Sequence, residues 1–75
     1  MKELVEYMAK SLVDDPEQVE VHEIRAGPST VIKLHVAPED MGRVIGKSGR
    51  VANAMRALLK VAAAKAGKRA VLEIE

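Results

Sequence analysis

Apolar residues recur at two different spacings along this 75-residue chain, and the changes in spacing divide it into elements. In residues 2–13 they recur every three or four positions with charged residues between them, which predicts a helix. Pro16 ends this pattern, because a proline disfavours helical backbone at the residue before it. Residues 18–25 and 30–37 instead alternate apolar and polar positions, which predicts two strands joined by a turn at residues 26–29.

The turn sets the pairing of these two strands. If it centres between residues 27 and 28, the strands form an antiparallel hairpin whose apolar side chains share one face. Glu23 would lie on that face opposite Ile32, where its carboxylate either accepts a hydrogen bond from a base amine or reaches solvent; we favour solvent, since an exposed Glu is the common case. The expected apolar pairs are Val19 with Val36 and Val21 with Leu34, and Ile24 meets Val31 on the other face.

The second half of the chain predicts two helices and a third strand. A proline and two acidic residues at 38–40 favour a helix start, because acids are stabilised near the positive end of the helix dipole. This short helix runs into Gly46, and a longer helix follows from Arg50 to about Ala66. Residues 70–75 alternate again and predict the last strand.

Both longer helices carry an apolar stripe. Its members are Leu4, Val5, Met8, Leu12 and Val13 in the first helix, and Val51, Met55, Leu58, Leu59 and Ala62 in the second. The two helices between the second and third strands form a right-handed crossover, which joins parallel strands. We therefore expect an α+β fold in a single domain of residues 1–75, with residues 30–37 at the centre of a three-stranded mixed sheet and helices on one face.

Composition narrows the classes of protein. There is no cysteine, so a disulfide framework and a thiolate metal site are excluded. The start of the chain lacks the apolar core of a secretory signal, and no apolar run approaches the ~20 residues of a membrane span. We therefore expect a soluble, cytoplasmic protein that does not act at a membrane.

Charge is unevenly distributed although the net charge is only +1. Residues 41–72 carry eight basic and no acidic side chains, whereas residues 1–40 carry nine acidic and four basic ones. This asymmetry favours a polyanionic partner for the basic half. The alternative is a solvated helix face whose charge is neutralised by the acidic half.

The segment MGRVIGKSGRV, residues 41–51, contains the Gly-Lys-Ser tripeptide of nucleotide-binding loops. Such a loop needs a glycine five positions before Gly46, but that position is Met41 and the upstream glycine is Gly42. The preceding segment also predicts a helix and not a buried strand, and no later strand ends in an aspartate for magnesium. An ATPase or GTPase is therefore disfavoured, and no other catalytic set or metal-ligand spacing is present.

The same segment is also consistent with a Gly-x-x-Gly turn between two helices. Gly46 and Gly49 permit a tight turn and close approach of another backbone. The amides of Ser48, Gly49 and Arg50 begin a helix, whose N-terminus attracts anions. Lys47 and Ser48 add a cation and a hydroxyl donor, which suits consecutive phosphodiesters better than one triphosphate.

The stretch VIGKSGRVANAMR, residues 44–56, resembles the core of the KH domain, an RNA-binding module with an Ile-Gly-x-x-Gly loop. The predicted order of helix, strand, strand, helix, helix, strand is that of the type II version. In length, start and end the chain is similar to the small single-KH proteins of the bacterial KhpA family, and Val51 matches the family's apolar residue after the loop. The resemblance implies single-stranded RNA binding without catalysis or cofactor, in post-transcriptional regulation or RNA chaperoning.

By this resemblance residues 46–49 hold the backbone of about four nucleotides. Bases would lie in an apolar groove beside the loop, toward which Val44, Ile45 and Val51 are nearest, although at least one of these must be core. Gly42 either lets a sugar or base approach or permits tight helix packing. The expected RNA-binding set is Gly42, Arg43, Val44, Ile45, Gly46, Lys47, Ser48, Gly49, Arg50 and Val51.

Other basic side chains have two interpretations. Arg43, Arg50 and Arg56 either add contacts to RNA or form a solvated face, and the second interpretation is favoured for Lys60 and Lys65, which are farther from the loop. The cations Lys68 and Arg69 follow a helix C-terminus, where they are favoured in any case.

One alternative function stays open. Members of the resembled family are associated with pairing, as homodimers or with a larger KH-containing RNA-binding protein. The chain would then be a KH-fold protein–protein module that binds little RNA itself. A pure scaffold would not need Lys47 and Ser48 between two glycines, which favours RNA binding. Tyr7 is the single aromatic residue, so stacking platforms of the RRM or OB kind are excluded.

Overall fold

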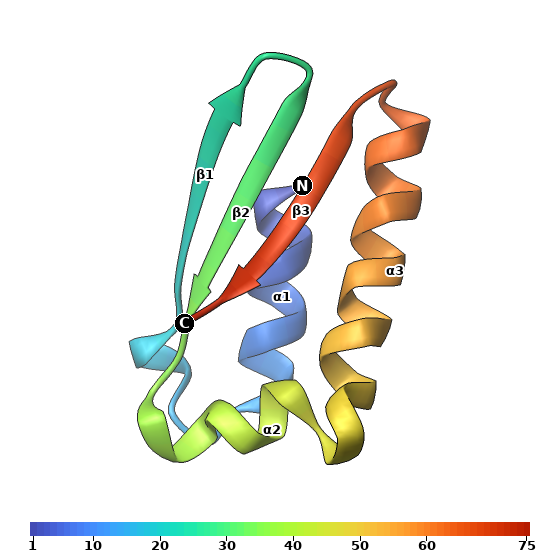
Figure 1. The fold of residues 1–75 in the computed structure, drawn as a ribbon. Helices are drawn as coiled ribbons and strands as arrows, with labels where there is room; N and C mark the ends of the chain where they lie inside the picture. Colours follow the sequence, from blue (N-terminus) through green and yellow to red (C-terminus); the bar gives the residue numbers. More distant parts are fainter.

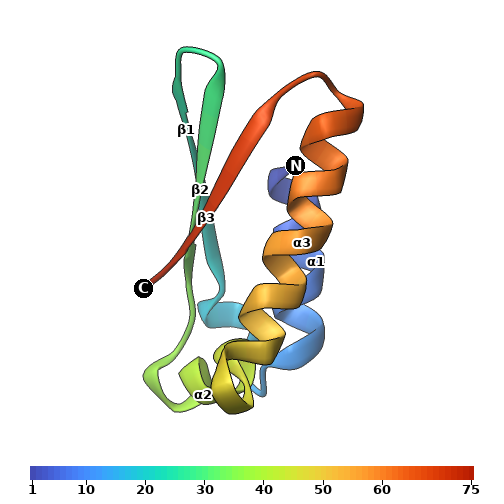
Figure 2. The ribbon, with the colours of Figure 1, turned by 45° about the vertical axis from the view of Figure 1, so that its right-hand side comes forward.

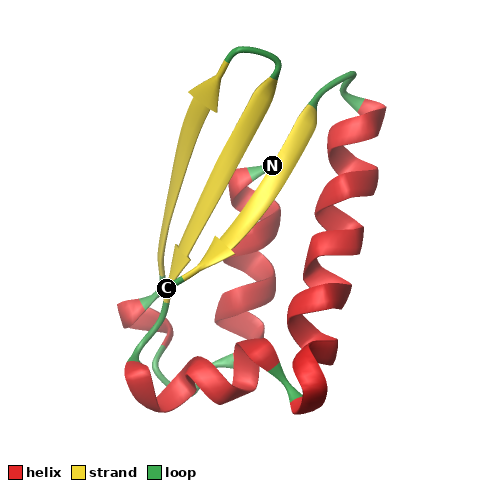
Figure 3. Cartoon of the chain, viewed as in Figure 1, coloured by secondary structure: helices red, strands yellow, loops and turns green.

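Three strands form one sheet, and helices cover one of its faces (Figures 1 and 2). The computed structural model describes residues 1–75. The helices and strands are α1 (Lys2–Leu12), β1 (Glu20–Ala26), β2 (Ser29–His35), α2 (Met41–Ile45), α3 (Arg50–Lys65) and β3 (Arg69–Ile74). This is the predicted element order, and short 3-10 turns precede β1, α2 and α3 (Figure 3).

The sheet has the predicted topology, with β2 in the centre, antiparallel to β1 and parallel to β3. Val21 pairs with Leu34 and Ile24 with Val31, so the predicted register is confirmed. The pair of Val19 with Val36 is wrong as a ladder pair, because a 3-10 turn at Pro16–Gln18 delays the start of β1 to Glu20.

The core lies between the sheet and helices α1 and α3. Its buried members are Val5, Ala9, Val21, Ile32, Leu34, Val36, Val44, Met55, Leu59 and Leu72. Both predicted stripes are rotated slightly from the true buried faces. Leu12 and Leu58 are exposed, whereas Ala9, Ala52 and Ala63 are buried. The small alanine side chains let each helix lie close to its neighbours, and the larger leucines are left on the helix shoulders.

The β1–β2 hairpin extends past the N-terminal end of α1 (Figure 1). Beyond Val21 no residue of β1 is buried, and Glu23 is exposed, as the solvent interpretation of its carboxylate expects. The β2 partners on the helix-side face, Ile32 and Thr30, are buried, so only the β1 edge of this part of the sheet is open to solvent. Among the helices, none has the length and apolar character that crossing a membrane would require.

Candidate nucleic-acid interface

The Gly-x-x-Gly loop joins α2 to α3 at the end of the molecule opposite the β1–β2 turn (Figure 1). Gly46, Ser48 and Gly49 all have positive φ angles, of 75°, 58° and 75°. A Cβ on Gly46 would lie 2.5 Å from Cγ2 of Val51 and 2.9 Å from its backbone nitrogen, so no side chain fits there. The apolar residue after the loop thus packs under it and makes the first glycine necessary.

Backbone hydrogen bonds close the loop upon itself. The amide of Gly49 donates to the carbonyl of Gly46 at 3.2 Å, and the amide of Arg50 donates to the carbonyl of Lys47. Of the three amides that begin the helix, those of Gly49 and Arg50 are therefore engaged within the turn. The side chains of Lys47 and Ser48 are exposed, so they carry most of what the loop can offer to a phosphate.

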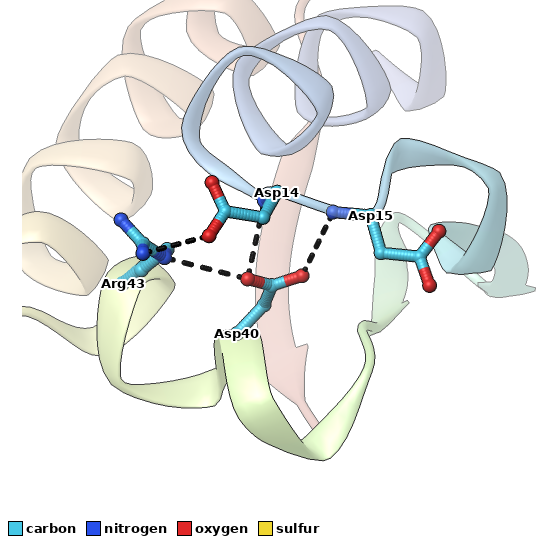
Figure 4. Close-up of polar contacts among 4 residues, drawn as sticks. All are labelled: Asp14, Asp15, Asp40 and Arg43. Carbon is cyan, nitrogen blue, oxygen red and sulfur yellow. Dashed lines mark hydrogen bonds and ion pairs between the residues drawn. The ribbon is translucent and has the colours of Figure 1, made fainter.

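A buried carboxylate anchors the helix that leads into the loop (Figure 4). Asp40 is only 2% exposed, and its two carboxylate oxygens accept hydrogen bonds from the amides of Asp14 and Asp15, both at 3.1 Å. Arg43 pairs with Oδ2 of Asp14 at 2.8 Å and with Oδ1 of Asp40 at 3.4 Å. These contacts join the segment after α1 to the start of α2 and hold the approach to the loop in place.

The residues expected to bind RNA differ in how exposed they are and in whether they are already ion-paired. Val44 is fully buried in the core and cannot reach a base, whereas Ile45 is exposed. Gly42 is exposed, and a Cβ there would meet nothing within 4 Å, so its tight-packing interpretation is wrong. Arg43 is engaged by two carboxylates and is less available to a phosphate than Arg50, which is exposed and forms no ion pair.

A basic groove lies between α3 and the open edge of β3, and we call it the β3 groove. Its volume is about 640 Å³, and it is lined by Ser29, Lys60, Ala63, Ala64, Lys68, Arg69, Ala70 and Val71. Nearer the loop, Nε of Arg56 donates to the carbonyl of Leu72 at 3.4 Å and bridges the same two elements. An edge strand presents unpaired backbone donors and acceptors. The groove thus combines a small-residue floor, cations and backbone polar groups.

This groove was not predicted from the sequence. The pattern favoured a solvated face for Lys60 and a role at a helix C-terminus for Lys68 and Arg69. Only the parallel pairing of β3 with β2 brings these residues together beside α3. The available signal was the absence of acidic side chains from residues 41–72, which fits a groove for a polyanion.

A second groove, on the other flank of α3, is apolar, and we call it the α1 groove. It has a volume of about 320 Å³ and is lined by Tyr7, Met8, Ser11, Leu12, Val51, Ala54, Met55 and Leu58. Tyr7 is 73% exposed and Leu58 is 55% exposed, which is unusual for large apolar side chains at neighbouring positions. Val51 therefore lies beneath the loop and in this groove, not in the groove that carries the cations.

Comparisons with known proteins agree with this geometry. The family model described as "KhpA/KhpB, KH domain" matches residues 2–74. Proteins named "RNA-binding protein KhpA" are similar over 99% of this chain and 99% of their own length: that of Clostridium perfringens is 57% identical and that of Caldanaerobacter subterraneus 58% identical. The protein of that name from Aquifex aeolicus is 49% identical over 99% of this chain and 94% of its own length.

Proposed function

Because the chain belongs to the KhpA/KhpB family of KH domains, we propose that it binds single-stranded RNA by clamping the phosphate backbone at residues 46–49. The relatives are named as RNA-binding proteins and none for a reaction, and this protein is not an enzyme. Post-transcriptional regulation or RNA chaperoning is the role that we propose for the bound state.

The observation that carries the clamp is the conformation of the loop. Contact with Val51 excludes any side chain at Gly46, and the bonds of Asp40 fix the start of α2, so the exposed Lys47 and Ser48 are held in one arrangement before RNA arrives. A preformed site loses little conformational entropy on binding. Arg50, exposed in the first turn of α3, extends the positive surface.

We place the bases in the β3 groove. Its alanine-rich floor admits a flat ring, and the cations on its rim, Lys60, Lys68 and Arg69, can neutralise phosphates that run along it. Ile45, exposed next to the loop, is the remaining apolar candidate of the three predicted ones. Without aromatic stacking, affinity depends mainly on phosphate contacts and falls as salt is added.

The test of the clamp is the double substitution Lys47→Asp with Ser48→Asp. Two carboxylates would face the phosphates, while the exposed loop side chains contribute little to the core, so we expect loss of RNA binding in a folded protein. Binding is measured by fluorescence anisotropy and folding by circular dichroism. Lys10→Asp is a control, since Lys10 is an exposed cation of α1 outside both grooves. Unchanged affinity in the folded double variant would rule out the loop.

The α1 groove favours a second, compatible function in protein pairing. Its exposed apolar side chains suit a two-fold contact between copies of this chain, in which the same patch serves both partners. A larger KH-containing RNA-binding protein could present an equivalent helix surface. Light scattering at rising concentration measures this directly, and a monomer at all concentrations would contradict self-pairing.

A further inference from the structure

A third cavity lies at the end of the molecule opposite the Gly-x-x-Gly loop. It has a volume of about 220 Å³ and no apolar residue in its lining. We call it the hairpin pocket, and its residues are Arg25, Gly27, Pro28, Thr30, Gly67 and Lys68. They come from the β1–β2 turn and the α3–β3 turn, which lie together at one end of the sheet (Figures 1 and 2).

Backbone contacts hold the two turns against each other. The amide of Arg69 donates to the carbonyl of Pro28 at 3.4 Å, and Ser29 pairs with Arg69 at the start of the parallel ladder. Arg25 lies directly across the hairpin from Thr30, which is buried although it lines the pocket. The arginine and the threonine are therefore placed by the register of the sheet, and Lys68 by the turn that leads into β3.

The two cations of this pocket are not neutralised within the protein. The four ion pairs of the structure include neither Arg25 nor Lys68, in contrast to Arg43, which has two carboxylate partners. Glu23 shares the sheet face of Arg25 but is not ion-paired with it. A guanidinium, an ammonium and a hydroxyl that converge without an acid match the oxygens of a phosphate.

The pocket is continuous with the proposed path of RNA, because Lys68 lines both the hairpin pocket and the β3 groove. We propose that the hairpin pocket is a second phosphate site, which holds the RNA backbone after the strand has left the loop and passed along the groove. This inference rests on the proposed clamp. The domain then binds the RNA backbone at both ends of α3, and not at the loop alone.

The length of α3 sets the RNA length that this grip needs. Its 16 residues span about 24 Å at 1.5 Å per residue. A stacked strand covers that distance in about seven nucleotides at 3.4 Å each, and an extended strand in fewer. A stacked tetranucleotide, about 14 Å long, therefore reaches only one end, whereas a stacked decanucleotide reaches both.

The experiment compares oligouridylates of four and ten nucleotides on the full chain. Arg25→Glu should weaken binding of the decanucleotide about tenfold or more and leave the tetranucleotide within about twofold. Lys65→Glu is the matched control: it reverses an exposed cation near the same end of α3 that lines none of the three cavities. It should change neither affinity by more than about threefold. The salt dependence of decanucleotide binding should also become shallower only with Arg25→Glu.

Two results would overturn the second site. Equal weakening by Arg25→Glu and Lys65→Glu would show a general charge effect, and an unchanged decanucleotide affinity would show that Arg25 does not touch RNA. Arg25→Ala, which adds no acid, repeats the measurement if the reversal unfolds the protein. Should Lys47→Asp abolish binding at both lengths while Arg25→Glu has no effect, the clamp stands and the hairpin pocket alone is refuted. If the wild type binds neither oligonucleotide, both proposals fall.

Discussion

The two flanks of α3 differ in chemistry although they belong to one helix. The flank toward α1 presents Val51, Ala54 and Leu58. The flank toward β3 presents Lys60 and Ala64, with Arg56 nearer the Gly-x-x-Gly loop. Between them runs the buried stripe of Ala52, Met55, Leu59 and Ala63. A helix with a small-residue stripe lies close to the sheet, and both shoulders then stay accessible. One helix can thus separate a surface suited to protein from a surface suited to a polyanion.

The strongest test of this separation is Leu58→Glu, which places a charge in the α1 groove. We expect it to abolish self-pairing, because an unpaired carboxylate cannot be buried at an apolar contact. Tetranucleotide affinity should stay within about threefold, since Leu58 lies on the other flank from the β3 groove. Light scattering and anisotropy measure the two effects on the same sample. Parallel loss of pairing and RNA binding in a folded variant would show that the flanks are not independent.

A smaller effect is expected from Lys60→Glu on the opposite flank. Lys60 lines the β3 groove, so decanucleotide binding should weaken about tenfold and the salt slope should decrease, while pairing is unchanged. The control is Val61→Glu on the neighbouring exposed residue, which lines neither groove. A larger loss of RNA binding with Val61→Glu than with Lys60→Glu would contradict the assignment of the groove.

The smallest effect concerns RNA sequence and sharpens the nature of the charged flank. A surface that acts through phosphates should distinguish short single strands of equal length only a few-fold, with nearly the same salt dependence for each. A panel of tetranucleotides measures this. One sequence preferred by more than about a hundredfold, roughly 2.7 kcal/mol, would show that the groove recognises base edges.

The order of the elements and the register of the hairpin were predictable from the sequence, since both follow from local patterns. Alternation in the two strands, with Gly27 and Pro28 between them, was enough to pair Val21 with Leu34. The rotation of α3 was less predictable. The apolar pattern of α3 predicts that Leu58 is buried in preference to Ala52. The distance between the helix and the sheet decides which side chain fits, and the sequence of the helix does not specify that distance.

The anchoring role of Asp40 could not be found in the same way. Its partners are backbone amides of Asp14 and Asp15, and the first of these lies 26 residues earlier in the chain. Every non-proline residue carries a backbone amide, so the sequence does not show which amides a distant carboxylate will bind. The acidic residue predicted a helix start, which is correct but incomplete. The loop was predictable in identity, and the grooves around it were not, because they form between elements far apart in the chain.

The parallel pairing of β3 has a consequence for the order in which the binding surface is assembled. β3 follows every other element of the fold in the chain and joins β2 only after the long crossover from His35 to Arg69. The hairpin forms through contacts near in sequence, whereas the pairing of β2 with β3 joins residues as far apart as Ser29 and Arg69, and such distant contacts slow folding. The loop also relies on a distant contact, since Asp40 binds the amides of Asp14 and Asp15. The β3 groove exists only when β3 is paired with β2, so the last strand of the chain completes the surface that we propose for RNA.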